Sequence, residues 1–230
     1  RFAMLENDFN EEILDERERL LKIKNDPWEF LKCVRTKDQV DLLKPIKPFP
    51  VQYDYLKLYV RVWQREKLLV IPKSRRMRLS WTTIALYTHD ALFNIGRHDA
   101  FVSKKDENSD ELVQRAHFIC ENLDYEKLPK ELLPKWKYTY NNLEFPEIDS
   151  KIQGFPSGSD QLRQFTLSGM FLDEFAFWPE AEAYYSSAYP TLEGGGRCTM
   201  VSSPAPGFFQ RVVFDQIDRN HGNQGGRNEG

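Results

Sequence analysis

The chain has 230 residues, 40% of them hydrophobic and 29% charged, which is ordinary for a globular protein with one sizeable core. Its sequence contains no apolar run of the roughly 18 residues that a membrane helix needs, and its acidic N-terminal stretch does not resemble a signal peptide. The net charge of −3 gives no general reason to expect nucleic acid. The three cysteines are far apart without metal-ligand spacing, so we expect buried thiols in a reducing interior (Cys33, Cys120 and Cys198).

Positive charge is nevertheless concentrated in one part of the sequence. Between Lys57 and Arg78 there are eight Lys and Arg residues against a single acid, Glu66. A patch of this kind can bind the phosphates of a nucleotide or of DNA. A solvated helix face would explain the first half of the patch, but the arginines of the second half follow directly on an apolar run.

The N-terminal part of the chain predicts helices followed by an extended connector. Residues 1–24 are rich in Glu, Asp, Arg and Leu and predict a surface helix. Asp26-Pro27-Trp28 predicts a second helix start, with Asp as the cap and Pro in the first turn. Three prolines between Lys44 and Pro50 favour an extended connector. We therefore expect three parts, namely an N-terminal helical or lid segment (1–44), a core (45–217) and a flexible C-terminal linker or tail (218–230).

Within the core, short apolar runs alternate with helical patterns. The expected strands are 67–71, 100–103, 168–172 and 197–202, and the expected helices are 52–64, 82–93 and 109–123. The first strand has the continuous apolar character of a buried parallel strand. This alternation predicts a mostly parallel sheet flanked by helices, which binds ligands beyond the C-terminal ends of its strands.

A basic loop follows the first expected strand, where a phosphate-binding loop would lie. The usual pattern, G-x-x-x-x-G-K-[ST], is missing, since Arg78 and Leu79 stand in place of its last glycine and its lysine. An ordinary turn with surface arginines is one interpretation of this loop. In the other, Lys73 supplies the ammonium from the start of the loop and Ser80 holds Mg²⁺. The expected nucleotide-binding residues are Lys73, Ser74, Arg75, Arg76, Met77, Arg78, Leu79, Ser80 and Trp81.

Two consecutive carboxylates, Asp173 and Glu174, end the third expected strand. In P-loop ATPases of the additional-strand catalytic-glutamate class, the aspartate assists Mg²⁺ and the glutamate polarises the attacking water. Solvated turn acids are the alternative, which the apolar strand before them and the basic loop about 100 residues upstream disfavour. The sequence thus predicts an α/β P-loop NTPase of the RecA-like (ASCE) type with an N-terminal helical appendage.

Weaker signals complete the candidate site. Ser202 and Ser203 end the fourth strand and are candidates to sense the terminal phosphate and couple hydrolysis to movement. Gln52, after the proline connector, could read the adenine edge, although a surface or capping role is the simpler interpretation. Arg163 lies in a polar loop before the acidic strand and is a candidate arginine finger, in competition with the arginines of the basic loop.

Together these segments resemble the large terminase subunits of tailed bacteriophages. Lys73–Ser80 resembles their phosphate loop, 171–178 their acidic motif, 202–204 their coupling motif, and 50–52 their adenine-binding glutamine. The resemblance spans about 45–215. Arg78 stands where the family usually has glycine and Arg76 where glutamine is common, so a tighter or remodelled loop is expected.

The resemblance implies an ATPase that uses ATP and Mg²⁺ to drive double-stranded DNA into a procapsid. Implied partners are the DNA, the portal protein and the small terminase subunit, with a homo-oligomeric ring on the portal and a location in the host cell cytoplasm. Nuclease activity is not expected of this chain, because the residues after Pro204 look mostly linker-like. The alternatives are another nucleic-acid-stimulated P-loop ATPase of helicase type and a nucleotide-binding module with little turnover.

Overall fold

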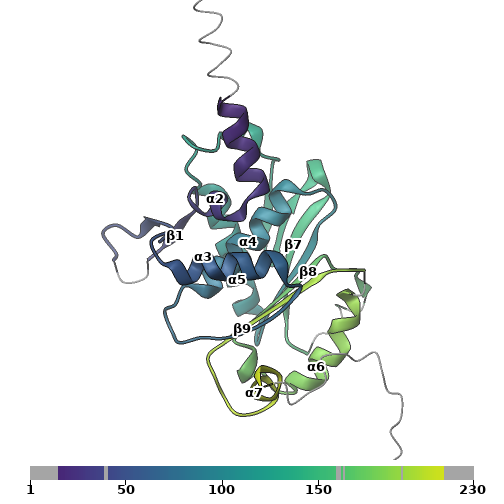
Figure 1. Ribbon diagram of the computed structural model, residues 1–230. Helices are drawn as coiled ribbons and strands as arrows, with labels where there is room; N and C mark the ends of the chain where they lie inside the picture. Colours follow the sequence, from purple (N-terminus) through teal and green to yellow (C-terminus); the bar gives the residue numbers. More distant parts are fainter. Residues whose placement is uncertain (1–14, 39–40, 159–161, 163, 193, 215–230) are drawn as a thin grey trace, which may run out of the picture.

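The computed structural model describes residues 15–38, 41–158, 162, 164–192 and 194–214. In this part of the chain, a seven-stranded sheet has the order β3-β9-β8-β4-β7-β6-β5 (Figure 1). The strands are β3 (Leu68–Pro72), β4 (His98–Ser103), β5 (Lys137–Thr139), β6 (Asn142–Phe145), β7 (Ser150–Pro156), β8 (Gly169–Asp173) and β9 (Arg197–Ser202). In this spatial order the strands β3, β9, β8, β4 and β7 run parallel to one another. The strands β6 and β5 continue the sheet beyond β7 as an antiparallel edge. The predicted α/β class with a mostly parallel sheet is confirmed.

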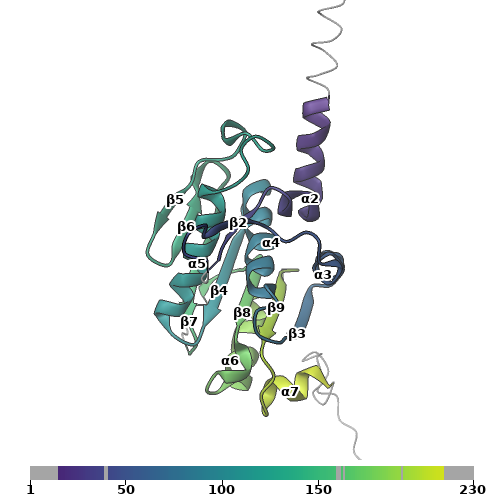
Figure 2. The same ribbon diagram turned by 90° about the vertical axis from the view of Figure 1, so that its left-hand side faces the viewer.

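Helices cover the sheet on both faces. The α-helices are α2 (Pro27–Leu31), α3 (Asp54–Arg65), α4 (Leu79–Phe93), α5 (Asp106–Glu121), α6 (Ala181–Ala188) and α7 (Phe208–Val213). Short 3₁₀ turns lie at η1 (Lys130–Leu132), η2 (Pro146–Ile148), η4 (Phe175–Phe177) and η5 (Tyr189–Leu192). Figures 1 and 2 show α3, α4 and α5 together, with α6 and α7 grouped away from them.

Alternation along the strands explains the two helical layers. On β8, Phe171 packs into the cluster formed with α2 to α5, whereas Met170 and Leu172 pack into the cluster formed with η4, α6 and α7. On β4, Phe101 likewise belongs to the first cluster and Val102 to the second. Successive side chains of a strand point to opposite faces, so a central strand that is apolar throughout must be covered on both.

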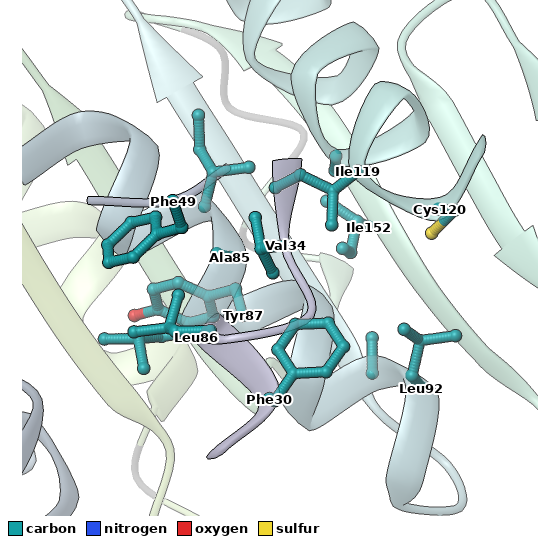
Figure 3. Close-up of a cluster of buried hydrophobic side chains, with 14 of the residues drawn as sticks. Phe30, Val34, Phe49, Ala85, Leu86, Tyr87, Leu92, Ile119, Cys120 and Ile152 are labelled. Atoms are coloured by element: carbon teal, nitrogen blue, oxygen red, sulfur yellow. The ribbon is translucent and has the colours of Figure 1, made fainter. Parts of the chain in front are cut away.

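The N-terminal segment packs against the face covered by α4. Residues 15–25 are helical, and Asp26 caps α2 by accepting a hydrogen bond from the Trp28 N–H, as predicted. The proline connector is extended and forms β2 (Ile46–Pro48), which pairs with β1 (Arg35–Lys37) in an antiparallel hairpin. Phe30, Val34 and Phe49 lie beside Leu86 and Tyr87 of α4 (Figure 3). The division at residue 44 remains a prediction, and 218–230 and 1–14 lie outside the described residues.

Several elements differ from the sequence-based expectation. β3 is parallel as predicted, but it is an edge strand with half-buried residues rather than a fully buried one, because it pairs with β9 alone. The strands β5 to β7 and the helix α6 were not predicted. α7 was not predicted either. Most of the segment after Pro204 lies outside the described residues, so its linker-like character remains a prediction. Finally, α4 begins at Leu79 instead of residue 82, which brings Ser80 into its first turn.

Two further expectations concern the chain as a whole. The three cysteines are all described, and each is a buried free thiol, as predicted. Burial raises the pKa of the Cys33 thiol to about 11 and that of Cys198 to about 12. Among the described residues, none of the helices combines the length and the apolar character that crossing a membrane requires.

Candidate functional site: a cavity at the strand ends

The basic loop connects the end of β3 to the start of α4. Its first residue, Lys73, donates its backbone N–H to the Ser202 carbonyl at 2.9 Å, which ties the loop to the end of β9. The loop then turns through two left-handed residues, Arg76 at φ 66° and Arg78 at φ 57°. α4 starts immediately afterwards at Leu79. The unpaired N–H groups and the positive dipole end of this helix therefore lie at the loop, where an anion is stabilised.

Arg78 occupies a backbone conformation that favours glycine. A left-handed φ costs a residue with a Cβ about 1 kcal/mol or more, so glycine is the residue that would fit this position without strain. The Arg78 side chain makes a contact that glycine cannot make, since its Nη1 donates to Thr36 Oγ1 of β1 at 3.3 Å. The Arg78 side chain thus links the loop to the N-terminal hairpin of β1 and β2, and the expected tightening or remodelling of the loop remains a prediction.

The acidic pair lies directly opposite the loop. Asp173 is the last residue of β8 and accepts a hydrogen bond from Ser80 Oγ at 2.8 Å. Glu174 has a left-handed backbone, φ 49°, and its Oε1 forms an ion pair with Lys73 Nζ at 2.6 Å. The change of backbone conformation between the two residues sends their carboxylates to different partners. Loop and strand residues that are about 100 positions apart in the sequence are thereby brought into direct contact.

The two carboxyl groups are shifted in opposite directions. Burial raises the pKa of Asp173, against the opposing effects of the Ser80 hydrogen bond and the Lys73 charge. Burial also acts to raise the pKa of Glu174, but the hydrogen bond from Lys73 and the Ser203 N–H outweigh it, so the net shift is downward. Glu174 is therefore held as a carboxylate in this state, while Asp173 depends on a donor or cation to stay charged.

The end of β9 contributes the two candidate coupling residues. The backbone N–H of Ser203 donates to Glu174 Oε2 at 3.2 Å, and Ser202 Oγ lies 3.5 Å from the same oxygen. Ser202 Oγ also accepts a hydrogen bond from the Ala176 N–H at 3.0 Å. The segment after β9 is thus connected to the carboxylate of Glu174 and to the turn behind it. A displacement of Glu174 would be transmitted to this segment.

A cavity of about 660 Å³ lies beside these groups, and Ser202 and Ser203 are not among its lining residues. Lys73, Ser80, Asp173 and Glu174 line it, together with most of the loop between them (Arg75, Arg76, Met77, Arg78, Leu79 and Trp81). Lys37, Asp38 and Arg115 complete the lining. The volume lies within the range of small-molecule sites, and the lining is rich in cations, as a polyphosphate requires.

Other predicted site residues lie elsewhere. Gln52 is exposed in the turn before α3 and does not line the cavity, and Ser74 is exposed on the loop. The segment that carries Gln52 is still next to the loop, because the Tyr55 hydroxyl donates to the Met77 carbonyl at 3.2 Å. Arg163 lies outside the described residues.

Three cavity residues were not anticipated from the sequence. Lys37 and Asp38 lie at the end of β1, and Arg115 lies in the middle of α5. None of them belongs to a recognisable motif, and each reaches the cavity through packing between elements that are distant in the sequence. The only sequence signal for Arg115 was the helical periodicity of α5. This periodicity places Arg115 one turn from Glu111, but it does not predict which neighbouring element the Arg115 side chain faces.

A second and larger depression, about 960 Å³, lies between the helix of residues 15–25 and the end of α4. Its walls include Leu20, Leu21, Leu92 and Ile148, and it is away from the acidic pair and the loop. Its charged lining residues come from the N-terminal helix and from the segments around residues 131 and 147, and none of them belongs to the loop or to the acidic strand end. The smaller cavity is therefore the candidate site.

The residues at this site fit a magnesium ion. The Ser80 hydroxyl and the Asp173 carboxylate are 2.8 Å apart, and Mg²⁺ prefers hard oxygen ligands of this kind. The buried position of Asp173 raises the cost of its negative charge, which a divalent cation would offset. Among the described residues, no group of three His, Cys, Asp or Glu side chains forms an all-protein metal cage. Mg²⁺ commonly uses one or two protein ligands together with substrate phosphates instead.

The strand order, the loop and the acidic strand end define the class of the fold as an α/β P-loop ATPase fold. The particular fold is that of phage large terminase ATPase domains, as solved structures show. The Thermus phage P74-26 large terminase ATPase domain matches at a TM-score of 0.56 and 17% identity, over 83% of this chain and 78% of that one. The HK97 bacteriophage large terminase matches at a TM-score of 0.56 and 9% identity, over 78% of this chain and 37% of that one.

A large terminase of a thermophilic bacteriophage, solved in complex with ADP, matches at a TM-score of 0.50 and 17% identity. The match covers 71% of this chain and 42% of that terminase. This chain therefore spans less than half the length of these two large terminase chains. No protein-family model and no curated protein sequence matches it. At these identities, the likeness establishes the fold, and the function has to be argued from the site.

Proposed function

We propose that this chain hydrolyses ATP and that hydrolysis drives double-stranded viral DNA into a procapsid. The observation that carries the proposal is the pair of contacts between loop and strand, Lys73 with Glu174 at 2.6 Å and Ser80 with Asp173 at 2.8 Å. A cation, a hydroxyl and two carboxylates converge where a phosphate-binding loop enters a helix. This is the set of groups that phosphoryl transfer to water requires.

Each of these residues has a proposed role in hydrolysis. Backbone N–H groups at the start of α4 hold the phosphates, and Lys73 exchanges its bond with Glu174 for the outer phosphates. Glu174 polarises a water whose oxygen forms a bond to the γ-phosphorus, while the bond from that phosphorus to the bridging oxygen of ADP breaks. The products are ADP, inorganic phosphate and a proton, which Glu174 accepts first. Ser202 and Ser203 move with Glu174 and couple the step to motion.

Ser80 and Asp173 are the proposed magnesium residues, the serine directly and the aspartate through water. When bound with the nucleotide, Mg²⁺ neutralises charge on the phosphates. Gln52 remains the proposed reader of the adenine edge and Arg163 the proposed arginine finger. The loop arginines remain competitors of Arg163 for the charge on the transferred group.

The packaging role is supported by the terminase-like fold and by an exposed basic stripe. Lys57, Arg61 and Arg65 repeat at every fourth residue of α3 and so share one face of the helix. Such a stripe suits the phosphates of double-stranded DNA. We further propose that the chain acts in a homo-oligomeric ring on the portal protein, with the small terminase subunit, in the host cell cytoplasm. The proposed parts are a lid segment (1–44), the ATPase core (45–217) and a linker (218–230).

ATP hydrolysis with and without DNA and portal tests the proposal. Glu174→Gln should retain ATP binding but hydrolyse at least about a hundredfold more slowly, which is the usual contribution of a general base. Lys73→Ala should weaken ATP binding and slow turnover. As a control, Glu182→Gln removes an exposed carboxylate of α6 that pairs with Arg211, and should leave both unchanged.

The outcomes separate the competing functions. If Glu174→Gln hydrolyses ATP like the wild type, the proposed mechanism is wrong. A wild-type chain that binds ATP but does not turn it over with DNA and portal would be a nucleotide-binding module. Replacing Lys57, Arg61 and Arg65 by Gln should abolish stimulation by DNA and leave the basal rate unchanged. Turnover that does not respond to DNA would contradict the packaging role.

A further inference from the structure

Arg115 brings a cation into the nucleotide cavity from a helix that carries none of the sequence motifs. It lies in the middle of α5 and lines the cavity together with Lys73, Asp173 and Glu174. The arginines of the loop are borne on a turn, whereas Arg115 projects from a regular helix of 16 residues packed on α4 and β7. Groups on regular elements are held more precisely than groups on loops.

Neighbouring aromatic rings hold the guanidinium of Arg115 in place. Its Cζ lies 5.7 Å from the ring centroid of Trp81, which is within the range of a cation–π contact. Trp81 in turn meets the ring of Phe118 edge to face, with centroids 5.9 Å apart. Phe118 is one turn further along α5, so α4 and α5 together fix the position of the Trp81 ring. A guanidinium that stacks on an indole ring still has N–H donors at the edge of the guanidinium plane, and these can bind oxygen acceptors.

Within α5, the positive charge of Arg115 is compensated only weakly by an acidic side chain. Its ion pair is with Glu111, one turn earlier, at 3.5 Å, and that side chain is 60% exposed. Exposed pairs of this spacing contribute little. Arg115 lines the same cavity as Asp173 and Glu174, so its guanidinium shares that space with the proposed magnesium residue.

We infer that Arg115 binds the terminal phosphate of ATP and thereby distinguishes the triphosphate from the diphosphate. The inference rests on the proposed function. Backbone N–H groups at the start of α4 suit the inner phosphates. Arg115 enters the same cavity from α5, a different element, and shares it with Asp173 and Glu174, where the terminal phosphate reacts in the proposed mechanism. A guanidinium can bind two phosphate oxygens at once, which matches the additional oxygens of the triphosphate.

Calorimetric binding of a non-hydrolysable ATP analogue and of ADP, each with Mg²⁺, tests the inference. Arg115→Gln should weaken binding of the analogue at least about tenfold, as expected for losing a hydrogen bond to a charged group, and change ADP binding less than about threefold. Arg115→Lys, which keeps the charge but loses the fork of donors, should show an intermediate loss. Glu111→Gln removes the partner of Arg115 on the helix and should change neither affinity.

The results distinguish this inference from the proposed function on which it rests. If Arg115→Gln weakens both nucleotides equally, or neither, while the wild type binds both, the assignment of Arg115 is wrong and the ATPase proposal stands. If the wild type binds neither nucleotide, both fail. Thermal unfolding of each variant shows whether a loss of affinity reflects loss of the fold, and the intermediate result expected of Arg115→Lys then identifies the guanidinium as the binding group.

Discussion

Replacing Arg78 by glycine and by alanine tests the left-handed turn in the basic loop between β3 and α4. Both substitutions remove the hydrogen bond from Arg78 to Thr36, so that loss cancels when the two variants are compared. What remains is the backbone at φ 57°, which glycine adopts freely and alanine does not. The glycine variant is therefore expected to have the more stable fold, although alanine gives the more stable fold at most positions.

The size of the effect follows from two opposing contributions. The left-handed conformation costs alanine about 1–2 kcal/mol. The greater freedom of glycine in the unfolded chain costs about 0.4–1 kcal/mol. We therefore expect Arg78→Gly to be more stable than Arg78→Ala by about 1 kcal/mol, which for a chain of this size is a melting-temperature difference of roughly 2–4 °C.

Thermal unfolding of both variants at neutral pH measures the difference. Arg61 provides a matched control, because it is an exposed arginine within the right-handed helix α3. There the order should reverse, with Arg61→Gly less stable than Arg61→Ala by about 1 kcal/mol. An Arg78→Ala variant that is as stable as Arg78→Gly would refute the left-handed assignment at this position.

Two further predictions concern the buried groups around the sheet. Burial raises the pKa of Asp173, so the folded state loses stability as pH rises through the titration of this carboxyl. Asp173→Asn should therefore unfold at a higher temperature than the wild type at about pH 7, with a gain that shrinks toward about pH 4; an equal gain at both pH values would contradict this. Gly169→Ala should destabilise the fold by about 1–3 kcal/mol in chemical denaturation, because its Cβ would collide with Tyr87 and lie 2.6 Å from Asp99 Oδ1. A neutral result there would show that the sheet relaxes around the methyl group.

The sequence predicts well those elements whose pattern of apolar and polar residues is contained in a short continuous segment. The strands β3, β8 and β9 are short apolar runs that end in polar residues, and these ends are recognisable without knowing the strand order. The loop and the acidic pair could be placed at one edge of the sheet because parallel strands all end on the same side. Their direct contacts, such as Lys73 with Glu174, agree with that placement.

What could not be predicted depends on packing between distant segments. β7 contains Gly154 and ends at Pro156, which locally indicate a break rather than a strand. The glycine is required because Asn141 and the backbone at Ser109 approach so closely that a Cβ would collide with the Asn141 side chain. The edge position of β3 likewise depends on strand order, which a run of apolar residues does not encode. Arg115 was missed for the same reason, since helical spacing does not reveal which element a side chain meets.

A structure of the protein with Mg²⁺ and a non-hydrolysable ATP analogue tests the central claim most directly. We predict that Lys73 Nζ leaves Glu174, with which it forms an ion pair at 2.6 Å in this structure, and contacts oxygens of the β- and γ-phosphates. Glu174 would then face a water in line with the γ-phosphorus. If Lys73 stays paired with Glu174 while Arg75, Arg76 or Arg78 holds the outer phosphates, the claim that the lysine of this loop has moved to its start is wrong.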